Sequence, residues 1–74
     1  MSNVSITFRL FRLRSDARLN QEDIANLLGI NRVVYCYYEN GKRSIPLHHL
    51  IKLANFYNVS LDYLVGRSDI RNFK

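Results

Sequence analysis

Six consecutive residues, 33–38, have side chains that are β-branched, aromatic or cysteine, a composition typical of buried strands. They lie within Gly29–Gly41, between segments whose apolar residues recur at helical spacing. A lone strand there would have no neighbouring strand to satisfy its buried backbone. Asn31 also stands where a helix N-cap belongs. The run is therefore predicted to be a helix with poor intrinsic propensity, and the whole chain to be all-α.

The strongest breaks in helical pattern occur at Gly29, Gly41, Pro46 and Gly66, and they divide the chain into short units. Each unit carries apolar residues at spacings of three and four, which is the period of a helix with one buried face. The expected buried stripes are Ile6, Leu10, Leu13 and Ala17; Ile24, Leu27 and Leu28; and Leu47, Leu50, Ile51, Ala54 and Tyr57.

Residues that favour helix ends stand at the boundaries of these units. Asn20 is the expected N-cap of the second unit, and Glu22 and Asp23 suit the positive end of its dipole. Pro46 is expected at the first helical position of the fourth unit. Ser60 is expected to cap a short last helix, "LDYLV". Together with the helix predicted around residues 33–38, these units predict five helices.

Length and composition limit the possibilities. A chain of 74 residues with one cysteine makes one small domain without an internal disulfide, here predicted as residues 1–74 with a core of about 5–66 and a tail of 67–74. No signal peptide or membrane span is expected, and the reducing cytosol is the expected location. The net charge of +5 and the pI of about 9.8 favour a polyanionic partner only weakly, because many small soluble domains are basic.

The segment 21–40, "QEDIANLLGINRVVYCYYEN", is interpreted as a helix, a glycine turn and a second helix. Ala25 is small where the helices would cross, and Gly29 suits the tight turn. The positions that must be apolar to lock the pair are Ile24, Leu28, Ile30, Tyr35 and Tyr38. With "RLNQEDIANLLGI", "YENGKRS" and "NVSLDYLVG" in this order over about residues 9–66, the chain resembles the Cro/phage-repressor (XRE) family of helix-turn-helix transcriptional regulators.

The resemblance implies a compact five-helix, lambda-repressor-like domain that places its recognition helix, about 32–39, in the DNA major groove. It also implies a homodimer, at least on DNA, that binds a palindromic double-stranded operator. The implied base contacts are Arg32, Val33, Cys36 and Tyr37. The implied phosphate contacts are Gln21, Asn31, Asn40, Lys42 and Arg43. Arg14 and Glu39 match a structural salt bridge between the first and third helices.

The sequence gives little support for metal binding or catalysis. His48 and His49 are adjacent and diverge by about 100° on a helix, so they cannot share a metal ion. Cys36 has no base at a recognisable spacing, and an inert contact is favoured over an oxidation sensor. No phosphate-binding glycine loop and no paired catalytic carboxylates are present. We therefore expect no cofactor, no metal and no enzymatic activity.

Two functions remain after these exclusions. The first is a sequence-specific DNA-binding transcriptional regulator, a repressor, in the cytoplasm of a bacterium or phage-infected cell and associated with the nucleoid. The second is a protein-interaction module, such as an antitoxin or anti-repressor partner. It is suggested by Val33, Cys36 and Tyr37, which make the outward face of the recognition helix less polar than most DNA-reading helices.

Aromatic residues also occur on the first helix where polar ones are expected. Phe8 and Phe11 lie opposite its apolar stripe, and the tail carries Ile70 and Phe73. Two explanations stay open: the tail folds back over Phe8 and Phe11, or the four residues form part of a subunit interface. Packing of the tail is favoured.

Overall fold

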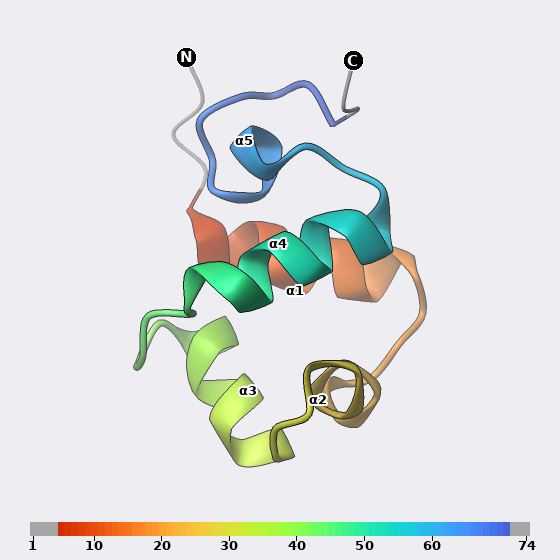
Figure 1. Ribbon diagram of the computed structural model, residues 1–74, viewed down its shortest axis with the longest axis vertical. Coiled ribbons are helices and arrows are strands. Elements are labelled where there is room, and N and C mark those ends of the chain that lie inside the picture. Colours follow the sequence, from red (N-terminus) through yellow and green to blue (C-terminus); the bar gives the residue numbers. More distant parts are fainter. Residues whose placement is uncertain (1–4, 72–74) are drawn as a thin grey trace.

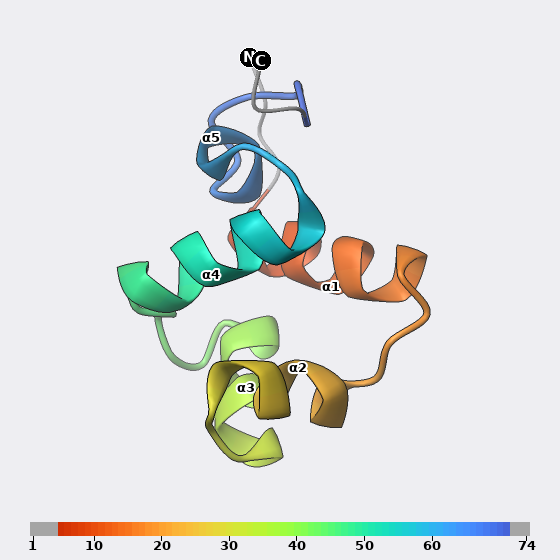
Figure 2. The same ribbon diagram turned by 45° about the vertical axis from the view of Figure 1, so that its right-hand side comes forward.

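The computed structural model describes residues 5–71. Within them the chain forms five helices and no strand, which confirms the all-α prediction. α1 and α4 cross the middle of the molecule, α2 and α3 lie together at one end, and α5 lies at the other (Figures 1 and 2). The helices are α1 (Ile6–Asp16), α2 (Gln21–Leu28), α3 (Arg32–Asn40), α4 (Leu47–Tyr57) and α5 (Leu61–Leu64).

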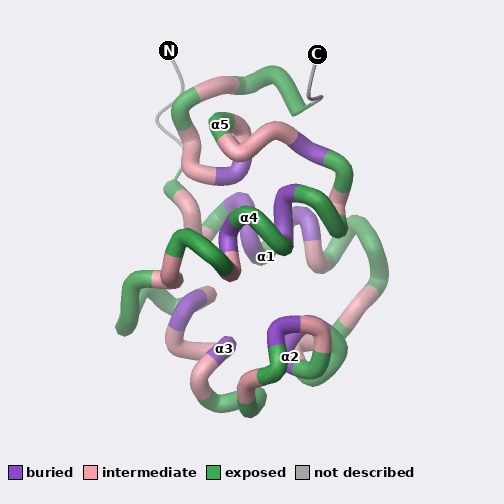
Figure 3. The backbone as a smooth tube through the Cα atoms, in the orientation of Figure 1, coloured by how far each residue is buried: buried purple, intermediate pink, exposed green. Residues whose placement is uncertain are grey.

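Residues 33–38 are helical, as predicted, and form the centre of α3. The Asn31 side chain accepts a hydrogen bond from the Val34 amide at 2.9 Å and starts the helix. Tyr35 and Tyr38 face inward and are 0% and 8% exposed, so α3 shows buried segments between more accessible ones (Figure 3). Burial of these two rings outweighs the low helix propensity of the run.

Side-chain caps begin four of the five described helices. Ser5, Asn20, Asn31 and Ser60 each accept a hydrogen bond from the amide three residues later. α4 differs, because Pro46 precedes it and has no side-chain acceptor. The expectation that Pro46 is the first helical residue is wrong. Its ψ of 152° is extended rather than helical, so the helix begins one residue later.

A left-handed residue stands at, or directly after, the C-cap of each of the five described helices and reverses the chain. Gly29 and Gly41 have φ values of 73° and 78°. The amides of the residues after them bond back to the carbonyls of Ala25 and Tyr37, which is the Schellman pattern. Arg18 and Asn58 adopt the same backbone conformation after α1 and α4, with φ values of 59° and 58°.

A single apolar core lies between the helices. Its members are Leu10, Leu13, Ile24, Ala25, Leu28, Tyr35, Tyr38, Leu50, Leu53, Ala54, Val59 and Leu64. The expected stripe on α4 is partly wrong, because Leu47 and Ile51 are 61% and 45% exposed whereas Leu53 is fully buried. Both stripes have helical spacing, and the neighbouring helices select the one that faces the core.

The buried face of α1 also differs from the expected stripe. Ala17 is exposed because α1 ends at Asp16 and the chain then turns away. Arg9, a charged residue that the apolar pattern does not include, is only 4% exposed. It lies beside Leu10 and Leu13 on the buried side of the helix.

Arg9 fastens the segment 67–71 to the helices. Its Nη1 donates to the carbonyls of Tyr63 and Ser68 at 2.8 and 3.1 Å, and its Nη2 donates to Asp69 at 3.1 Å. Ile70 is 65% exposed and adds little apolar packing. Residues 67–71 thus fold back mainly through polar contacts, rather than by the apolar cover that was expected.

The other residues expected to take part in packing of the tail are Phe8, Phe11 and Phe73. Phe8 and Phe11 are about half exposed, at 49% and 51%. Phe73 lies outside the described residues.

Among residues 5–71, no helix is long and apolar enough to span a membrane.

Candidate nucleic-acid interface

A rigid pair of helices, α2 and α3, carries the residues predicted to meet DNA. Ala25 is fully buried where the helices pack, and Gly29 makes the turn between them. Ile24 and Leu28 of α2 and Tyr35 of α3 belong to the same core. Because both helices contribute to this core, the outward face of α3 is held in a fixed orientation to the rest of the molecule.

The N-terminal end of α3 points into solvent. Arg32 and Val33 are exposed at its first two positions, and Val33 is 47% exposed. The oxygen of Asn31 is used for capping, which leaves its Nδ2 group for other partners. The N-terminal end of α3, which is the positive end of its dipole, thus presents the Arg32 guanidinium, the apolar surface of Val33 and the Nδ2 donor of Asn31.

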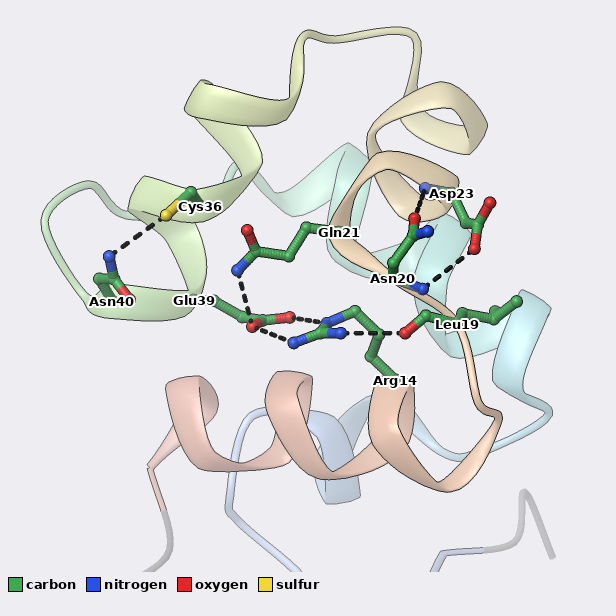
Figure 4. Close-up of polar contacts among 8 residues, drawn as sticks. All are labelled: Arg14, Leu19, Asn20, Gln21, Asp23, Cys36, Glu39 and Asn40. Atoms are coloured by element: carbon green, nitrogen blue, oxygen red, sulfur yellow. Dashed lines mark hydrogen bonds and ion pairs between the residues drawn. The ribbon is translucent and has the colours of Figure 1, made fainter.

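Cys36 and Tyr37, the other predicted base contacts, are less accessible and are half-buried. The Nδ2 group of Asn40, a predicted phosphate contact, donates to the Sγ of Cys36 at 3.3 Å (Figure 4). The structure therefore brings one predicted base contact and one predicted phosphate contact together on the side of α3.

Arg14 and Glu39 form an ion pair between α1 and α3 (Figure 4). The Nε and Nη2 atoms of Arg14 donate to the two carboxylate oxygens at 2.6 and 3.0 Å. Nη1 of Arg14 donates to the carbonyl of Leu19 at 2.9 Å. The two side chains are only 14% and 5% exposed, so the pair is a largely dry connection between the helices.

Gln21, a predicted phosphate contact, joins the same carboxylate. Its Nε2 donates to Glu39 at 3.2 Å from the first position of α2 (Figure 4). Burial alone would raise the pKa of Glu39, but the hydrogen bonds from Arg14 and Gln21 lower it below its ordinary value. Burial raises the pKa of Tyr35, whose ionised form would lie beside the Glu39 carboxylate. Glu39 therefore stays ionised and fixes the amide of Gln21.

Lys42 and Arg43 lie in the exposed loop after α3. Their charged groups lie 5.8 and 5.1 Å from the centre of the Tyr37 ring. The loop thus presents two cations next to the C-terminal half of α3, and the aromatic ring of Tyr37 contacts both.

Two histidines stand at the start of α4. The rings of His48 and His49 have centres 4.1 Å apart, and the Tyr38 ring lies 6.2 Å from that of His49. Partial burial, together with the nearby His48 and Lys52, lowers the pKa of His49. No group of three or more potential metal ligands occurs in the part of the chain that the structure describes.

Comparison with known proteins decides the family. A sequence pattern described as helix-turn-helix matches residues 10–64, which includes α2, α3 and the turn between them. The chain belongs to the XRE-type helix-turn-helix family. This membership confirms the resemblance on which the site assignments depend.

Several relatives of this XRE-type chain are regulators by name. It is 42% identical over 57 residues to the cryptic phage CTXphi transcriptional repressor RstR of Vibrio cholerae, covering 77% of this chain and 51% of that protein. It is 36% identical over 67 residues to the HTH-type transcriptional regulator ImmR of Bacillus subtilis, covering 90% and 53%. The chain thus spans about half the length of these relatives.

A solved structure has a similar fold. The crystal structure of a transcriptional regulator from Listeria innocua superimposes with a TM-score of 0.79 at 31% identity. The match covers 82% of this XRE-type chain and 57% of that one. The likeness extends well beyond the two helices of the motif, so the arrangement of the bundle is shared as well.

Two parts of this arrangement were missed by sequence reasoning. Arg9 was overlooked although it lies three residues after Ile6 and four before Leu13, so a cation on an apolar face was the available signal. The bond from Gln21 to Glu39 joins residues 18 apart in the sequence, and no local pattern predicts it. Both contacts depend on how separate helices pack.

Proposed function

We propose that this chain binds double-stranded DNA as a sequence-specific transcriptional regulator, a repressor, with α3 in the major groove. The observation that carries the proposal is the exposed pair Arg32 and Val33 at the N-terminal end of α3, in a chain of the XRE-type family. In helix-turn-helix proteins, the N-terminal residues of the second helix contact base edges. No residue is assigned a catalytic role in this proposal.

Seven of the predicted contacts have a chemical role in this proposal. Arg32 bonds to the O6 and N7 atoms of a guanine, and Val33 packs against a thymine methyl group. The remaining contacts hold the phosphate backbone through amides and cations. This second group contains Gln21, Asn31, Asn40, Lys42 and Arg43. The ionised Glu39 supports it by holding the Gln21 amide at the start of α2.

The chain is proposed to act as a homodimer on a palindromic operator, in the cytoplasm and in association with the nucleoid. Two copies related by a two-fold axis would place their α3 helices in successive major grooves on one side of the duplex. Selection of sites from a pool of random duplexes tests this symmetry. We expect an inverted repeat with half-site centres about 34 Å apart. Selection of a single, asymmetric half-site would contradict the dimer.

Replacement of Arg32 tests the assignment of base readout. Arg32→Ala is expected to weaken binding to the selected site by roughly 10- to 100-fold and to relax the preference at one base pair. Arg67→Ala is the matched control. It removes the same charge from an exposed side chain in the segment after α5, at the end of the molecule away from α3 (Figure 1). Equal effects of the two substitutions would contradict base readout by Arg32.

The rival function, a protein-interaction module, is not favoured by the comparisons, because the relatives named above are transcriptional regulators. The two functions differ in their response to salt. Counterion release makes DNA binding weaken steeply as salt rises, whereas contact through the apolar Val33 and Tyr37 would be far less sensitive. Affinity for duplex DNA at several salt concentrations therefore distinguishes them.

A further inference from the structure

The chain reversal after α3 brings two cations back over the helix they follow. Gly41 adopts a left-handed conformation, and the amides of Lys42 and Arg43 both donate to the carbonyl of Tyr37, at 2.9 and 3.3 Å. These backbone bonds place the start of the loop beside the last full turn of α3. The side chains of Lys42 and Arg43 consequently begin close to the ring of Tyr37.

The charged ends of the Lys42 and Arg43 side chains also lie close to the Tyr37 ring. The guanidinium of Arg43 lies 5.1 Å and the ammonium of Lys42 lies 5.8 Å from the centre of the Tyr37 ring. Cations within about 6 Å of an aromatic centre are attracted to the negative face of the ring. Tyr37 is half-buried, whereas the two cationic residues are exposed. One ring on α3 therefore attracts two exposed charges.

The position of Tyr37 along α3 argues against a role in reading bases. It is the sixth of nine residues in the helix, whereas base contacts concentrate at the N-terminal end of a recognition helix. Its ring is also engaged by cations of its own chain. Arg32 and Val33, at the other end of α3, are more exposed than Tyr37.

From these contacts we infer that Tyr37 is a positioning residue, which holds Arg43 and Lys42 toward DNA phosphates instead of contacting a base. The inference rests on the proposed DNA-binding function and revises the role predicted for Tyr37 from the family resemblance. It divides the outward side of α3 into an N-terminal half that reads sequence and a C-terminal half that organises backbone contacts. Restraint of the two cations before binding reduces the entropy that they lose when they meet phosphate.

The test compares Tyr37→Leu, which removes the ring, with Tyr37→Phe, which keeps the ring and removes only the hydroxyl. Affinity is measured for the selected site and for a random duplex over a range of salt concentrations. Tyr37→Leu is expected to weaken both complexes alike, by roughly 3- to 10-fold. The slope of log affinity against log salt is expected to fall by about one phosphate contact. Tyr37→Phe is expected to stay within about twofold of the parent protein.

A double-mutant cycle shows whether Tyr37 acts through the cations. In a background that already carries Lys42→Ala and Arg43→Ala, Tyr37→Leu is expected to cause no further loss of affinity. A further loss as large as in the parent background would overturn the inference. So would a loss of preference at one base pair in Tyr37→Phe, because that result would assign the hydroxyl to base readout.

One measurement needs neither DNA nor a variant that folds. In the NMR spectrum of the free parent protein, the Arg43 side-chain methylene protons are expected to be shifted upfield by the Tyr37 ring. Ordinary random-coil shifts would overturn the inference. If the parent protein bound no duplex at all, the proposed function would fail, whereas the NMR result would still report on the ring and its cations. The two failures are thus distinguishable.

Discussion

Glu39 links three helices through one buried carboxylate. It lies on α3, accepts hydrogen bonds from Arg14 of α1 and from Gln21 of α2, and its side chain is 5% exposed. The full charge of Glu39 is needed because both partners donate hydrogen bonds. At the scale of single residues, the position of the recognition helix therefore depends on one ionised group.

This dependence predicts how stability varies with pH. The folded-state pKa of Glu39 lies below its unfolded value, so its contribution is complete above the unfolded pKa and is lost as pH falls through the folded pKa. Glu39→Gln is expected to lower the free energy of unfolding at neutral pH by about 1.5–3 kcal/mol. The difference from the parent protein should shrink below about pH 4. Urea unfolding at several pH values measures it.

The control for Glu39→Gln is the same chemical change at the surface. Asp16 pairs with Arg12 on α1, and the two side chains are 44% and 58% exposed. Asp16→Asn is expected to change stability by less than about 1 kcal/mol, because exposed pairs contribute little. If Glu39→Gln lowered the free energy of unfolding no more than Asp16→Asn does, the buried pair would not be what holds α3 in place.

At the scale of elements, caps explain where the helices begin and end. Asn20, Asn31 and Ser60 were readable from the sequence as N-caps, because their side chains can satisfy amides without any distant partner. Pro46 was assigned one position too far into α4, because its φ fits both places and only ψ distinguishes them. Arg18 was not predictable as a left-handed residue, since arginine has no preference for that conformation.

Arg18 offers a test of backbone strain at such an end. Its φ of 59° is costly for a side chain with a Cβ atom, and the residue is exposed. Arg18→Gly is expected to exceed Arg18→Ala in stability by about 1 kcal/mol, a difference of roughly 4–8 °C in melting temperature. Both variants lose the same charge. The difference between their melting temperatures therefore reports the cost of the left-handed backbone conformation. Equal melting temperatures would contradict strain at this position.

At the scale of the whole molecule, the segment 67–71 closes the end opposite α2 and α3 (Figures 1 and 2). It is held from both sides. Arg9 of α1 donates to the carbonyl of Ser68 and to Asp69, and the Ser60 amide donates to the carbonyl of Arg71 at 2.6 Å. The Arg9 guanidinium also lies 3.8 Å from the centre of the Tyr63 ring. Residues 67–71 are thus part of the folded structure.

Deletion of residues 67–74 tests this role. Loss of two acceptors for the buried Arg9 is expected to lower the free energy of unfolding by about 1–3 kcal/mol. Melting temperature should fall while oligomeric state, measured by light scattering, stays unchanged. Asp69→Asn is the mild control, because Asp69 is 70% exposed and should matter little. A change from dimer to monomer on deletion would instead assign the tail to a subunit interface.

Local patterns were sufficient to predict five helices, the helix-turn-helix and the family, because apolar spacing, caps and glycine turns act within a few residues. Tertiary packing decided which face of each helix became the core. It exposed Leu47 and Ile51, buried Arg9, and joined Gln21 to Glu39. Several stripes on one helix satisfy the same period, and a buried charge requires partners from distant segments. Such choices depend on neighbouring helices, which a local pattern does not contain.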